Sequence, residues 1–175
     1  MNCAVAHYLH ERTTTLTYTI RKILPSDNRK IESIIRSCLI EYGGDHEGTA
    51  WADPYLGRFS EVYAKYGRCY FVAEDENGNV VGGVGIGEIP RFPHVCELQK
   101  MYCLPEARGT GCAQMLLGAA LEFAVGLYEE CYLETLPNMT RAGRFYEKNG
   151  FLRTDKILLG DEHFACDVRY IKKLG

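Results

Sequence analysis

A short loop with two glycines, placed between a strand pattern and a long helix pattern, constrains this chain more than any other feature. Residues 96–104 predict a strand that ends at Pro105. The loop Arg108–Ala113 follows and leads into an apolar stripe at helical spacing that runs to about Leu127. Glycines let successive backbone N–H groups point inward, and the start of a helix adds partial positive charge. The segment therefore predicts an anion site, with a phosphate or pyrophosphate as its guest and Arg108 nearby.

Other interpretations of the glycines lead to different chemistry. A turn that serves only chain geometry explains two loop glycines about as well as an anion site does. A P-loop is excluded, because no Gly-Lys-Ser/Thr follows to reach a terminal phosphate and Mg²⁺. Gly83, Gly85 and Gly87 share one face of a predicted strand, which indicates that a backbone or a ligand approaches closely there. That strand is no dinucleotide fingerprint, since no helix follows it and Glu88 stands where the third glycine would fall.

The order of predicted elements is that of a mixed α/β domain with hairpins at its ends and a strand–helix–strand–helix centre. No internal repeat or linker interrupts it. Residues 1–15 are expected to be a poorly ordered extension, and residues 16–175 to be the domain. Alternation and turn signals predict strands at 16–22, 68–74, 80–89, 96–104, 131–136, 151–159 and 163–172. Apolar spacing predicts helices from Asp27 to about Leu39 and over 55–66, 111–127 and 138–149.

Composition limits the class of protein. The 175 residues carry 20 Lys and Arg against 23 Asp and Glu, a net charge of -3, which argues against a dedicated nucleic-acid binder. The eight cysteines include no C-x-x-C pair, so we predict no metal site and expect most of them to be buried in a reducing compartment. No stretch approaches the ~20 apolar residues that span a bilayer, and residues 1–16 lack the apolar core of a secretory signal. We therefore expect a cytoplasmic protein that binds neither nucleic acid nor membrane.

The loop Arg108-Gly109-Thr110-Gly111-Cys112-Ala113 resembles the Arg/Gln-x-x-Gly-x-Gly/Ala loop of the GNAT superfamily of acetyl-CoA-dependent N-acetyltransferases. The similarity continues upstream through Leu98, Met101, Tyr102 and Pro105, and downstream through Leu133-Glu134-Thr135, Asn138, Ala142 and Phe145–Phe151. The resemblance implies a GNAT-like fold: a central, mostly antiparallel, twisted sheet of about seven strands, with flanking helices and a splayed parallel pair at the cofactor site. The N-terminal third fits in layout only, and that third usually shapes the acceptor pocket of the family.

The resemblance also implies acetyl-CoA as the co-substrate, without a metal. Backbone N–H groups of Arg108–Ala113 would hold its pyrophosphate, and the strand edge Met101–Cys103 would hydrogen-bond the pantetheine arm like an added strand. In the family a bulge splays the two central strands, which makes room for that arm. The N–H of Met101 would then face the thioester oxygen as a one-donor oxyanion site. The implied cofactor-binding residues are Met101, Tyr102, Cys103, Arg108, Gly109, Thr110, Gly111, Cys112, Ala113, Asn138 and Tyr146.

Acetyl transfer to an amine needs two proton movements, and the resemblance points to a residue for each. The acceptor ammonium, with a pKa near ~10, must lose a proton before its nitrogen attacks, and the departing thiolate gains one. Tyr146 matches the family tyrosine that donates to the leaving sulfur; its alternative role is that of a half-buried aromatic side chain on an amphipathic helix. Glu97 matches a glutamate that some family members use as the base, directly or through water. Glu88 is the rival base, and either carboxylate has the alternative of being a solvated charge at a strand end.

Several other reactive side chains receive structural roles. Cys103 and Cys112 are expected to pack near the cofactor, since a covalent acyl-cysteine route would need an adjacent base. His94 and His163 are isolated in predicted loops, and we expect them to be non-catalytic. The acidic loop that contains Asp45-His46-Glu47 and Asp53 is interpreted as solvated charge, with a rim that attracts a cationic amine as the alternative.

The predicted function is transfer of acetyl from acetyl-CoA to a primary amine, by direct attack within a ternary complex. The alternatives are a catalytically silent acyl-CoA-binding module, acting as a sensor or interaction protein, and a transferase for another acyl group. Small amines, amino acids, antibiotics and protein N-termini are all open as acceptors, because fold-level resemblance does not give a substrate. The assembly is also open, with a homodimer as one option.

Overall fold

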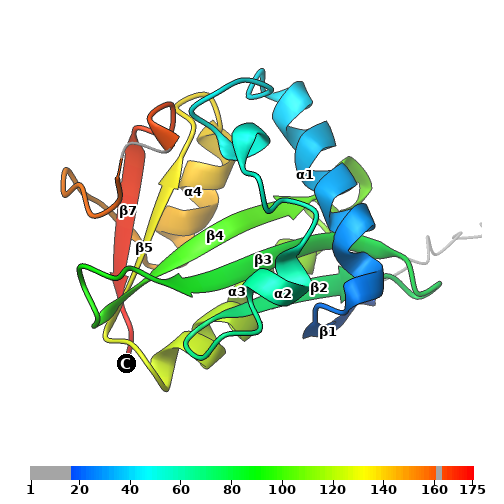
Figure 1. Ribbon diagram of the computed structural model, residues 1–175, viewed down its shortest axis with the longest axis horizontal. Coiled ribbons are helices and arrows are strands. Elements are labelled where there is room, and N and C mark those ends of the chain that lie inside the picture. The colour runs from blue at the N-terminus through cyan, green and yellow to red at the C-terminus, as the bar shows by residue number, and fades with distance from the viewer. Residues whose placement is uncertain (1–16, 161–162) are drawn as a thin grey trace, which may run out of the picture.

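The computed structural model describes residues 17–160 and 163–175. Its centre is one twisted seven-stranded sheet in the order β1-β2-β3-β4-β5-β7-β6 (Figure 1), which confirms the predicted mixed α/β class. Neighbouring strands are antiparallel except β4 and β5, which are parallel. The strands are β1 (Thr19–Lys22), β2 (Cys69–Glu74), β3 (Val80–Glu88), β4 (Val95–Cys103), β5 (Glu130–Thr135), β6 (Leu152–Arg153) and β7 (Val168–Lys173). The predicted extension over residues 1–15 lies outside the described residues.

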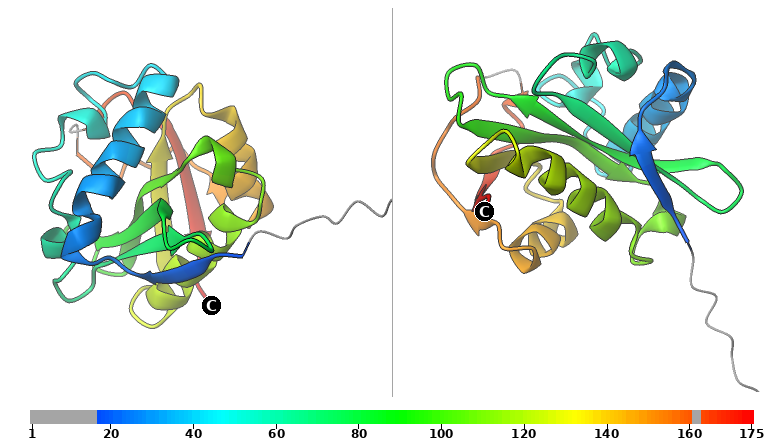
Figure 2. Two further views of the ribbon diagram at one scale, coloured as in Figure 1. Left: turned by 90° about the vertical axis from the view of Figure 1, so that its right-hand side faces the viewer. Right: turned by 90° about the horizontal axis from the view of Figure 1, so that it is seen from below.

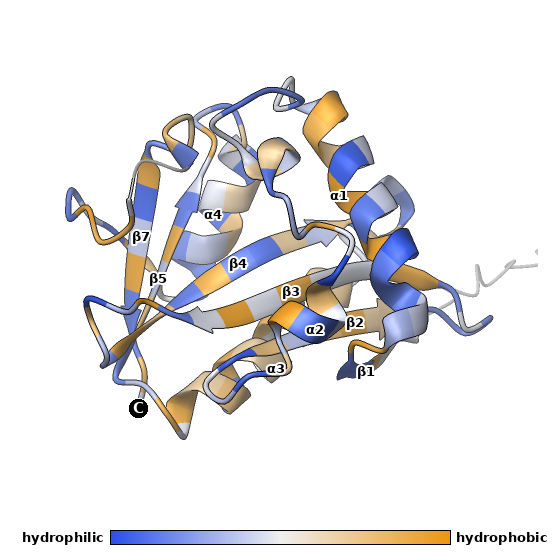
Figure 3. Cartoon of the chain, viewed as in Figure 1, coloured by the Kyte–Doolittle hydropathy of each residue, from blue (hydrophilic) through white to orange (hydrophobic). Residues whose placement is uncertain are grey.

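Helices cover both faces of the sheet, α1 and α2 on one face and α3 and α4 on the other (Figure 2). α3 is hydrophobic along most of its length (Figure 3), because it crosses β1 to β4 and buries side chains against them. No helix of the described ranges is both long enough and apolar enough to cross a membrane. The helices are α1 (Asn28–Glu41), α2 (Phe59–Val62), α3 (Cys112–Val125) and α4 (Thr140–Lys148), with the 3-10 turns η1 (Pro25–Asp27), η2 (Ala50–Ala52) and η3 (Pro105–Ala107).

α1 follows from its sequence pattern. The apolar residues that recur at helical spacing, from Ile31 to Leu39, are buried against the sheet, and Ile40 on the other face is exposed. Asp27, the residue before the helix, accepts the backbone N–H of Leu24 at 2.7 Å and pairs with Arg21 at 2.6 Å. Arg21 also pairs with Glu74 on β2 at 2.6 Å, so the start of α1 is fastened to the sheet. The predicted turn at Pro25–Asp27 is confirmed, and Asp27 stands at the N-cap position, but its side chain bonds Leu24 and Arg21 and does not cap α1.

Side chains of the same chain fill the glycine face of β3. The rings of Tyr63 and Tyr70 lie there with centroids 5.1 Å apart. A Cβ atom added to the strand would lie within 2.7 Å of the occupying side chain at each position: Tyr70 at Gly83, Tyr63 at Gly85 and Gln99 at Gly87. The predicted close approach is confirmed, but aromatic and amide side chains make it, where a ligand or a second backbone was expected.

β4 and β5 pair only over their first residues and then separate. The parallel register runs from Val95 opposite Glu130 to Glu97 opposite Tyr132. Beyond it, β5 stays paired with β7 while β4 stays paired with β3. The predicted splayed parallel pair is confirmed, and the strand edge that the separation leaves on β4 is available for other contacts.

A bulge in β4 accompanies the separation. The register with β3 shifts between Gly83 and Gly85, so that Lys100 and Met101 together lie opposite one residue. Lys100 adopts a φ of 50°, and its carbonyl oxygen accepts the hydroxyl of Tyr70 at 2.9 Å. The Tyr70 side chain, which lies against the glycine face of β3, thus holds the bend in β4 through this hydrogen bond.

Two predicted elements are shorter in the structure. The segment 55–66 contains only α2, because residues 54–57 form turns that start at Pro54, which lacks a backbone donor. The predicted strand 151–159 pairs with β7 only over β6, since Leu158 and Leu159 leave the sheet edge and pack beside Tyr132.

Two predicted starts are also displaced. The last strand begins at Val168, five residues later than predicted, because residues 163–165 form a turn whose Ala165 N–H donates to the Gly48 carbonyl at 3.1 Å. α4 begins at Thr140 and not at Asn138. The Asn138 side chain does not cap α4; its amide donates to the carbonyl of Tyr42 at the end of α1, at 2.7 Å.

Candidate active site

A cavity of about 280 Å³, here called the first cavity, opens where β4 has left β5. Its walls come from the end of α1, from β4 after the bulge, from the loop before α3 and from α4. The lining residues are Cys38, Tyr42, Met101, Tyr102, Cys103, Arg108, Gly109, Ala113, Met139, Arg141, Ala142, Phe145 and Tyr146. Most of the predicted cofactor-binding residues are thus brought together; those that do not line the cavity are Thr110, Gly111, Cys112 and Asn138.

The loop between β4 and α3 presents a row of unpaired backbone N–H groups. Gly109 and Gly111 have φ values of 78° and 97°, in the left-handed region that favours glycine. Within the described part of the chain, the N–H groups of residues 109–114 donate to no acceptor, and no side chain caps the start of α3. A Cβ atom added at either glycine would meet nothing within 4 Å, so the space before the loop is open. An anion such as pyrophosphate fits such a row at the start of a helix.

Arg108 holds this loop in place. Its backbone N–H donates to the Pro105 carbonyl at 3.2 Å, and its Nε donates to the Cys103 carbonyl at 2.9 Å. Its guanidinium pairs with both carboxylate oxygens of Glu41 on α1, at 2.6 and 2.7 Å, and lowers the pKa of that carboxyl group. Arg108 therefore clamps the loop between β4 and α1, and the row of unpaired N–H groups starts one residue later than predicted, at Gly109.

β4 and α4 supply the remaining groups of chemical interest. Met101–Cys103 line the cavity with a strand edge that has no pairing to β5. Tyr146 enters from α4, is 7% exposed, and packs among three aromatic rings with centroids 5.7 to 6.0 Å away. Burial raises the pKa of Tyr146 well above that of a free tyrosine, so its hydroxyl stays protonated.

The predicted residues that do not line the cavity support its walls. The Thr110 hydroxyl donates to the Ala107 carbonyl at 2.7 Å and contacts the Tyr18 hydroxyl at 2.8 Å. Cys112 is completely buried beneath the loop, and Cys103 is also buried, as expected for packing residues. Asn138 is held by its contact with α1.

Sequence reasoning missed one charged residue of this cavity. Arg141 lies in the first turn of α4 and lines the cavity near Glu41, whose pKa its charge helps to lower. The first turn of a helix disfavours a cation, because the backbone N–H groups there already carry partial positive charge. An arginine at that position is the signal that would have identified Arg141 as a candidate anion contact.

A second cavity, of about 640 Å³, lies along β4 before the bulge. Its polar lining residues are Asp53, Tyr63, Arg68, Glu97, Gln99, Lys100, Glu134 and His163. A small chamber of about 50 Å³ shares Tyr102 with the first cavity. With the second cavity it shares Glu97, Gln99, Lys100, Glu134 and His163. β4 therefore forms part of the wall of all three spaces.

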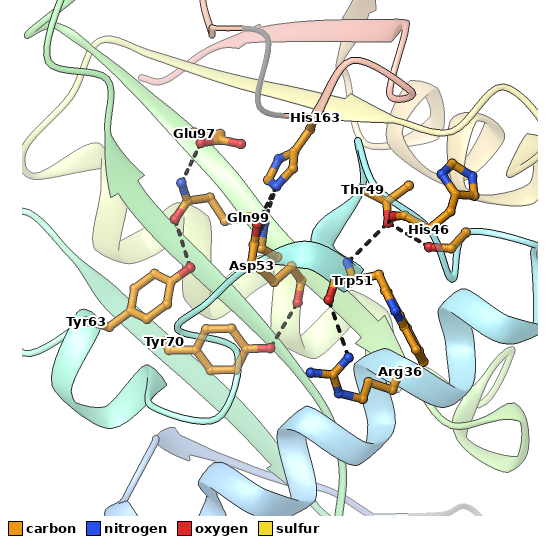
Figure 4. A network of polar contacts seen from close by, with 12 residues as sticks. Arg36, His46, Thr49, Trp51, Asp53, Tyr63, Tyr70, Glu97, Gln99 and His163 are labelled. Carbon is orange, nitrogen blue, oxygen red and sulfur yellow. Dashed lines mark hydrogen bonds and ion pairs between the residues drawn. The ribbon is translucent and has the colours of Figure 1, made fainter.

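Glu97 is the last residue of β4 that pairs with β5, and it lines both the second cavity and the chamber. The Gln99 amide donates to its carboxylate, and the Tyr63 hydroxyl donates to the Gln99 carbonyl oxygen at 2.8 Å (Figure 4). Burial raises the pKa of Glu97 above its usual range, although the charge of Lys100 opposes the shift. A carboxylate with a raised pKa accepts a proton more readily than an ordinary one.

Glu88, the other candidate base, is already held in an ion pair. Both oxygens of Glu88 accept hydrogen bonds from Arg68 at 2.5 Å, and this ion pair lowers the pKa of Glu88. Glu88 lines neither cavity nor the chamber. The geometry therefore favours Glu97 over Glu88 as the group that meets an acceptor.

Three polar side chains from distant segments meet beside Glu97. The His163 Nε2 lies 2.8 Å from the Asp53 carboxylate (Figure 4). The Lys100 Nζ lies 2.7 Å from the same carboxylate. Lys100 and His163 are themselves 3.4 Å apart. The expectation that His163 is isolated is thus wrong, because the loop before β7 folds back onto β4. Asp53, expected to be a solvated loop charge, is only 25% exposed and is paired twice.

Comparisons with known proteins agree with this arrangement. The family model described as the acetyltransferase (GNAT) family matches residues 30–151. The uncharacterized N-acetyltransferase YjgM of Escherichia coli K12 is 39% identical over 158 residues, which cover 89% of this chain and 94% of that protein. An uncharacterized N-acetyltransferase of Schizosaccharomyces pombe is 28% identical over 133 residues, 75% of this chain and 80% of its own length.

Solved structures share the fold at low sequence identity. A GNAT-family acetyltransferase of Staphylococcus aureus Mu50 has a TM-score of 0.77 at 19% identity, over 91% of this chain and 100% of its own. The PaiA N-acetyltransferase of Thermoplasma acidophilum, in complex with coenzyme A, has a TM-score of 0.67 at 19% identity, over 90% and 99%. The spermidine N-acetyltransferase of Vibrio cholerae, in complex with CoA and spermine, has a TM-score of 0.64 at 23% identity, over 90% and 95%.

The family model spans well over half of the chain, and the Escherichia coli relative is 39% identical along nearly all of it. In the chain that both match, a splayed strand pair and an open N–H row lie at one cavity. The chain therefore belongs to the GNAT acetyltransferase family and is an acyltransferase.

Proposed function

We propose that this enzyme transfers acetyl from acetyl-CoA to a primary amine, by direct attack within a ternary complex. The observation that carries the proposal is the position of two cavities along one strand, β4, on either side of its bulge. The first presents unpaired backbone groups that suit CoA, and the second presents carboxylates that suit an amine. The chamber that shares walls with both gives the two substrates a place to meet.

The first cavity suits the parts of acetyl-CoA in order. The N–H groups of residues 109–114 would bind the pyrophosphate, and the strand edge Met101–Cys103 would pair with the pantetheine amides. Arg141 would add a cation at the mouth of the cavity. The coenzyme A complexes of the Thermoplasma and Vibrio proteins support this assignment by analogy.

The proton movements then follow from the residues beside β4. Glu97 would take a proton from the acceptor ammonium, directly or through water. The nitrogen attacks the thioester carbon, and the Met101 N–H stabilises the charge that develops on the carbonyl oxygen. As the C–S bond breaks, Tyr146 donates its proton to the departing thiolate. The second proton that the nitrogen sheds returns Tyr146 to its neutral form, so the products are an amide and free CoA.

Measuring CoA release over a panel of amines tests this proposal. Varying acetyl-CoA against a working amine is expected to give intersecting initial-rate lines, because both substrates bind before transfer. Parallel lines would contradict direct attack and indicate a covalent intermediate. Tight acetyl-CoA binding without CoA release from any amine would overturn the transferase proposal and indicate a binding module. A higher kcat/KM with a longer acyl-CoA than with acetyl-CoA would show that the longer acyl group is the one transferred.

A further inference from the structure

We infer that the acceptor carries a carboxylate a few bonds from its amine, and that Lys100 binds that carboxylate. This inference rests on the proposed function, since it names the acceptor class of the same site. Amino acids with a free carboxyl group are the simplest members of the class.

The backbone of Lys100 is the first reason. It is the one non-glycine residue of the described chain with a positive φ, at 50°. Glycine and asparagine adopt this conformation more readily than lysine does. The Tyr70 hydroxyl holds the strained carbonyl of Lys100 at 2.9 Å, so the bend is built into the core. Strain retained at a cavity wall indicates a functional role for the side chain it positions.

The surroundings of the Lys100 ammonium are the second reason. The side chain is 13% exposed and lines both the second cavity and the chamber. Among the described residues, Asp53 is the one carboxylate within ion-pair distance, and Asp53 also pairs with His163. An ammonium has three N–H donors, so the shared carboxylate and the His163 nitrogen 3.4 Å away still leave donor capacity at the cavity wall. A carboxylate of the substrate supplies the missing acceptor oxygens.

The acidic side of the chamber is the third reason. Glu134 is occupied, because it accepts from Arg169 at 3.1 Å and from Tyr132 at 2.6 Å. Glu97 accepts only from the Gln99 amide among the described residues, so it can receive the acceptor ammonium. Glu97 and Lys100 line the same chamber of about 50 Å³. A ligand that meets both must carry its opposite charges close together, as a compact amino acid does.

The same cluster disfavours a polycation. A linear polyamine with its reacting amine at Glu97 would bring a second ammonium towards Lys100. Like charges in a partly buried site repel strongly, which excludes such a ligand as effectively as a clash. The site thus selects by charge at both ends of the acceptor.

Matched acceptor pairs test the inference. Each of a set of α- and β-amino acids is compared with its carboxamide, which keeps the amine and removes the negative charge. For the best acceptor we expect kcat/KM to be about tenfold or more higher for the acid, because a charged hydrogen bond is lost with the amide. Spermidine is expected to react more slowly than that acid.

Variants of Lys100 connect the preference to the side chain. K100M is expected to reduce the acid-to-amide ratio to about threefold or less, through a higher KM for the acid. Both substrates share any change in kcat that follows from losing the Lys100 charge near Glu97, so the ratio is the readout. K100R keeps the charge and should keep the preference. K30M, which removes an exposed lysine on α1, is the matched control and should change neither substrate.

The outcomes separate this inference from the proposed function. CoA release with simple amines or spermidine, at rates equal to or above those of every amino acid, overturns the inference and leaves the transferase intact. Equal losses for acid and amide in K100M also overturn it. Thermal shift with CoA and each probe gives a readout without turnover. A larger shift with the acid than with the amide, abolished in K100M, supports the carboxylate site even if no probe is acetylated, and equal shifts overturn it.

Discussion

The two cavities beside β4 are built from different parts of the chain. The first presents mainly backbone: an open row of N–H groups at residues 109–114 and a strand edge at Met101–Cys103. The second presents side chains, and its Asp53–Lys100–His163 cluster joins segments up to 110 positions apart. Backbone sites bind what every family member shares, whereas side-chain sites can change one residue at a time. Under the proposed function, CoA, which the family shares, would bind in the first cavity, and the acceptor, which varies, would bind in the second.

The largest effect is expected when the candidate general acid is removed and both cavities keep their shape. Tyr146→Phe removes the hydroxyl and retains the buried ring. We expect kcat to fall about a hundredfold or more, because general acid catalysis contributes at this level, with little change in KM for acetyl-CoA. Steady-state kinetics measure both. Tyr66→Phe, at a side chain that is 91% exposed, is the control. An unchanged kcat would return Tyr146 to a purely structural role.

The next largest effect is expected at Glu97 and tests whether this residue is the base that deprotonates the acceptor. Glu97→Gln keeps the size of the side chain and is expected to lower kcat/KM about tenfold to a hundredfold. The base acts when deprotonated, so wild-type kcat should rise with pH through a pKa above the usual range of glutamate, and this rise should be absent in the variant. Tyr146 adds no fall below about pH 10, since its pKa is raised.

Glu88→Gln is the matched control for that experiment. Glu88 is neutralised by Arg68 and lines neither cavity, so its variant should keep both the rate and the pH profile. If the rise of kcat with pH is lost in Glu88→Gln and kept in Glu97→Gln, then Glu88 is the base and Glu97 is not.

A smaller effect tests whether the first cavity depends on backbone geometry. Gly111→Ala forces a side chain onto a φ of 97° and disturbs the N–H row without a clash. The strain is about 1–2 kcal/mol, so KM for acetyl-CoA should rise about tenfold while amine discrimination stays the same. Gly118→Ala, within α3 and also free of clashes, is the control and should slightly stabilise the protein. Equal KM values in the two variants would contradict a backbone site.

The smallest effect concerns the clamp that positions the loop. Arg108→Ala and Glu41→Ala, alone and together, form a double-mutant cycle. The Glu41 side chain is 42% exposed, so we expect the coupling in unfolding free energy to be about 1 kcal/mol or less, decreasing with added salt. Arg108→Ala should cost more than Glu41→Ala, since it also loses the bond to the Cys103 carbonyl. Urea denaturation of the wild type and the three variants measures these free energies. If no coupling is found at low salt, contacts other than this ion pair hold the loop.

The sequence predicted the first cavity better than the second for a physical reason. Two glycines just before an apolar helix form a local pattern, so the row of unpaired N–H groups at 109–114 could be placed within one residue. Tyr146 lies one helical turn after Ala142, another residue that matches the family pattern. Such short-range features are visible in a single sequence because the contacts and the pattern involve the same residues.

Long-range contacts are what the sequence could not supply. Arg108 was expected beside a phosphate, but it pairs with Glu41, 67 positions away. His163 was expected to be isolated, but it meets Asp53 across 110 positions. Nothing local distinguishes a solvated charge from a paired one, because the partner is chosen by how the loops return to β4. The positive φ of Lys100 is equally hidden, since no glycine or asparagine marks the bulge.

The glycine face of β3 has a consequence for how this enzyme can diversify. Because side chains are absent at Gly83 and Gly85, the hydroxyls of Tyr63 and Tyr70 reach across the strand to Gln99 and Lys100. Core tyrosines on the α2 side of the sheet therefore position polar groups of the second cavity, whereas the N–H row lies on a loop that Arg108 clamps to α1. Under the proposed function, substitutions in this part of the core would change the choice of amine, while the N–H row proposed to bind CoA would stay the same.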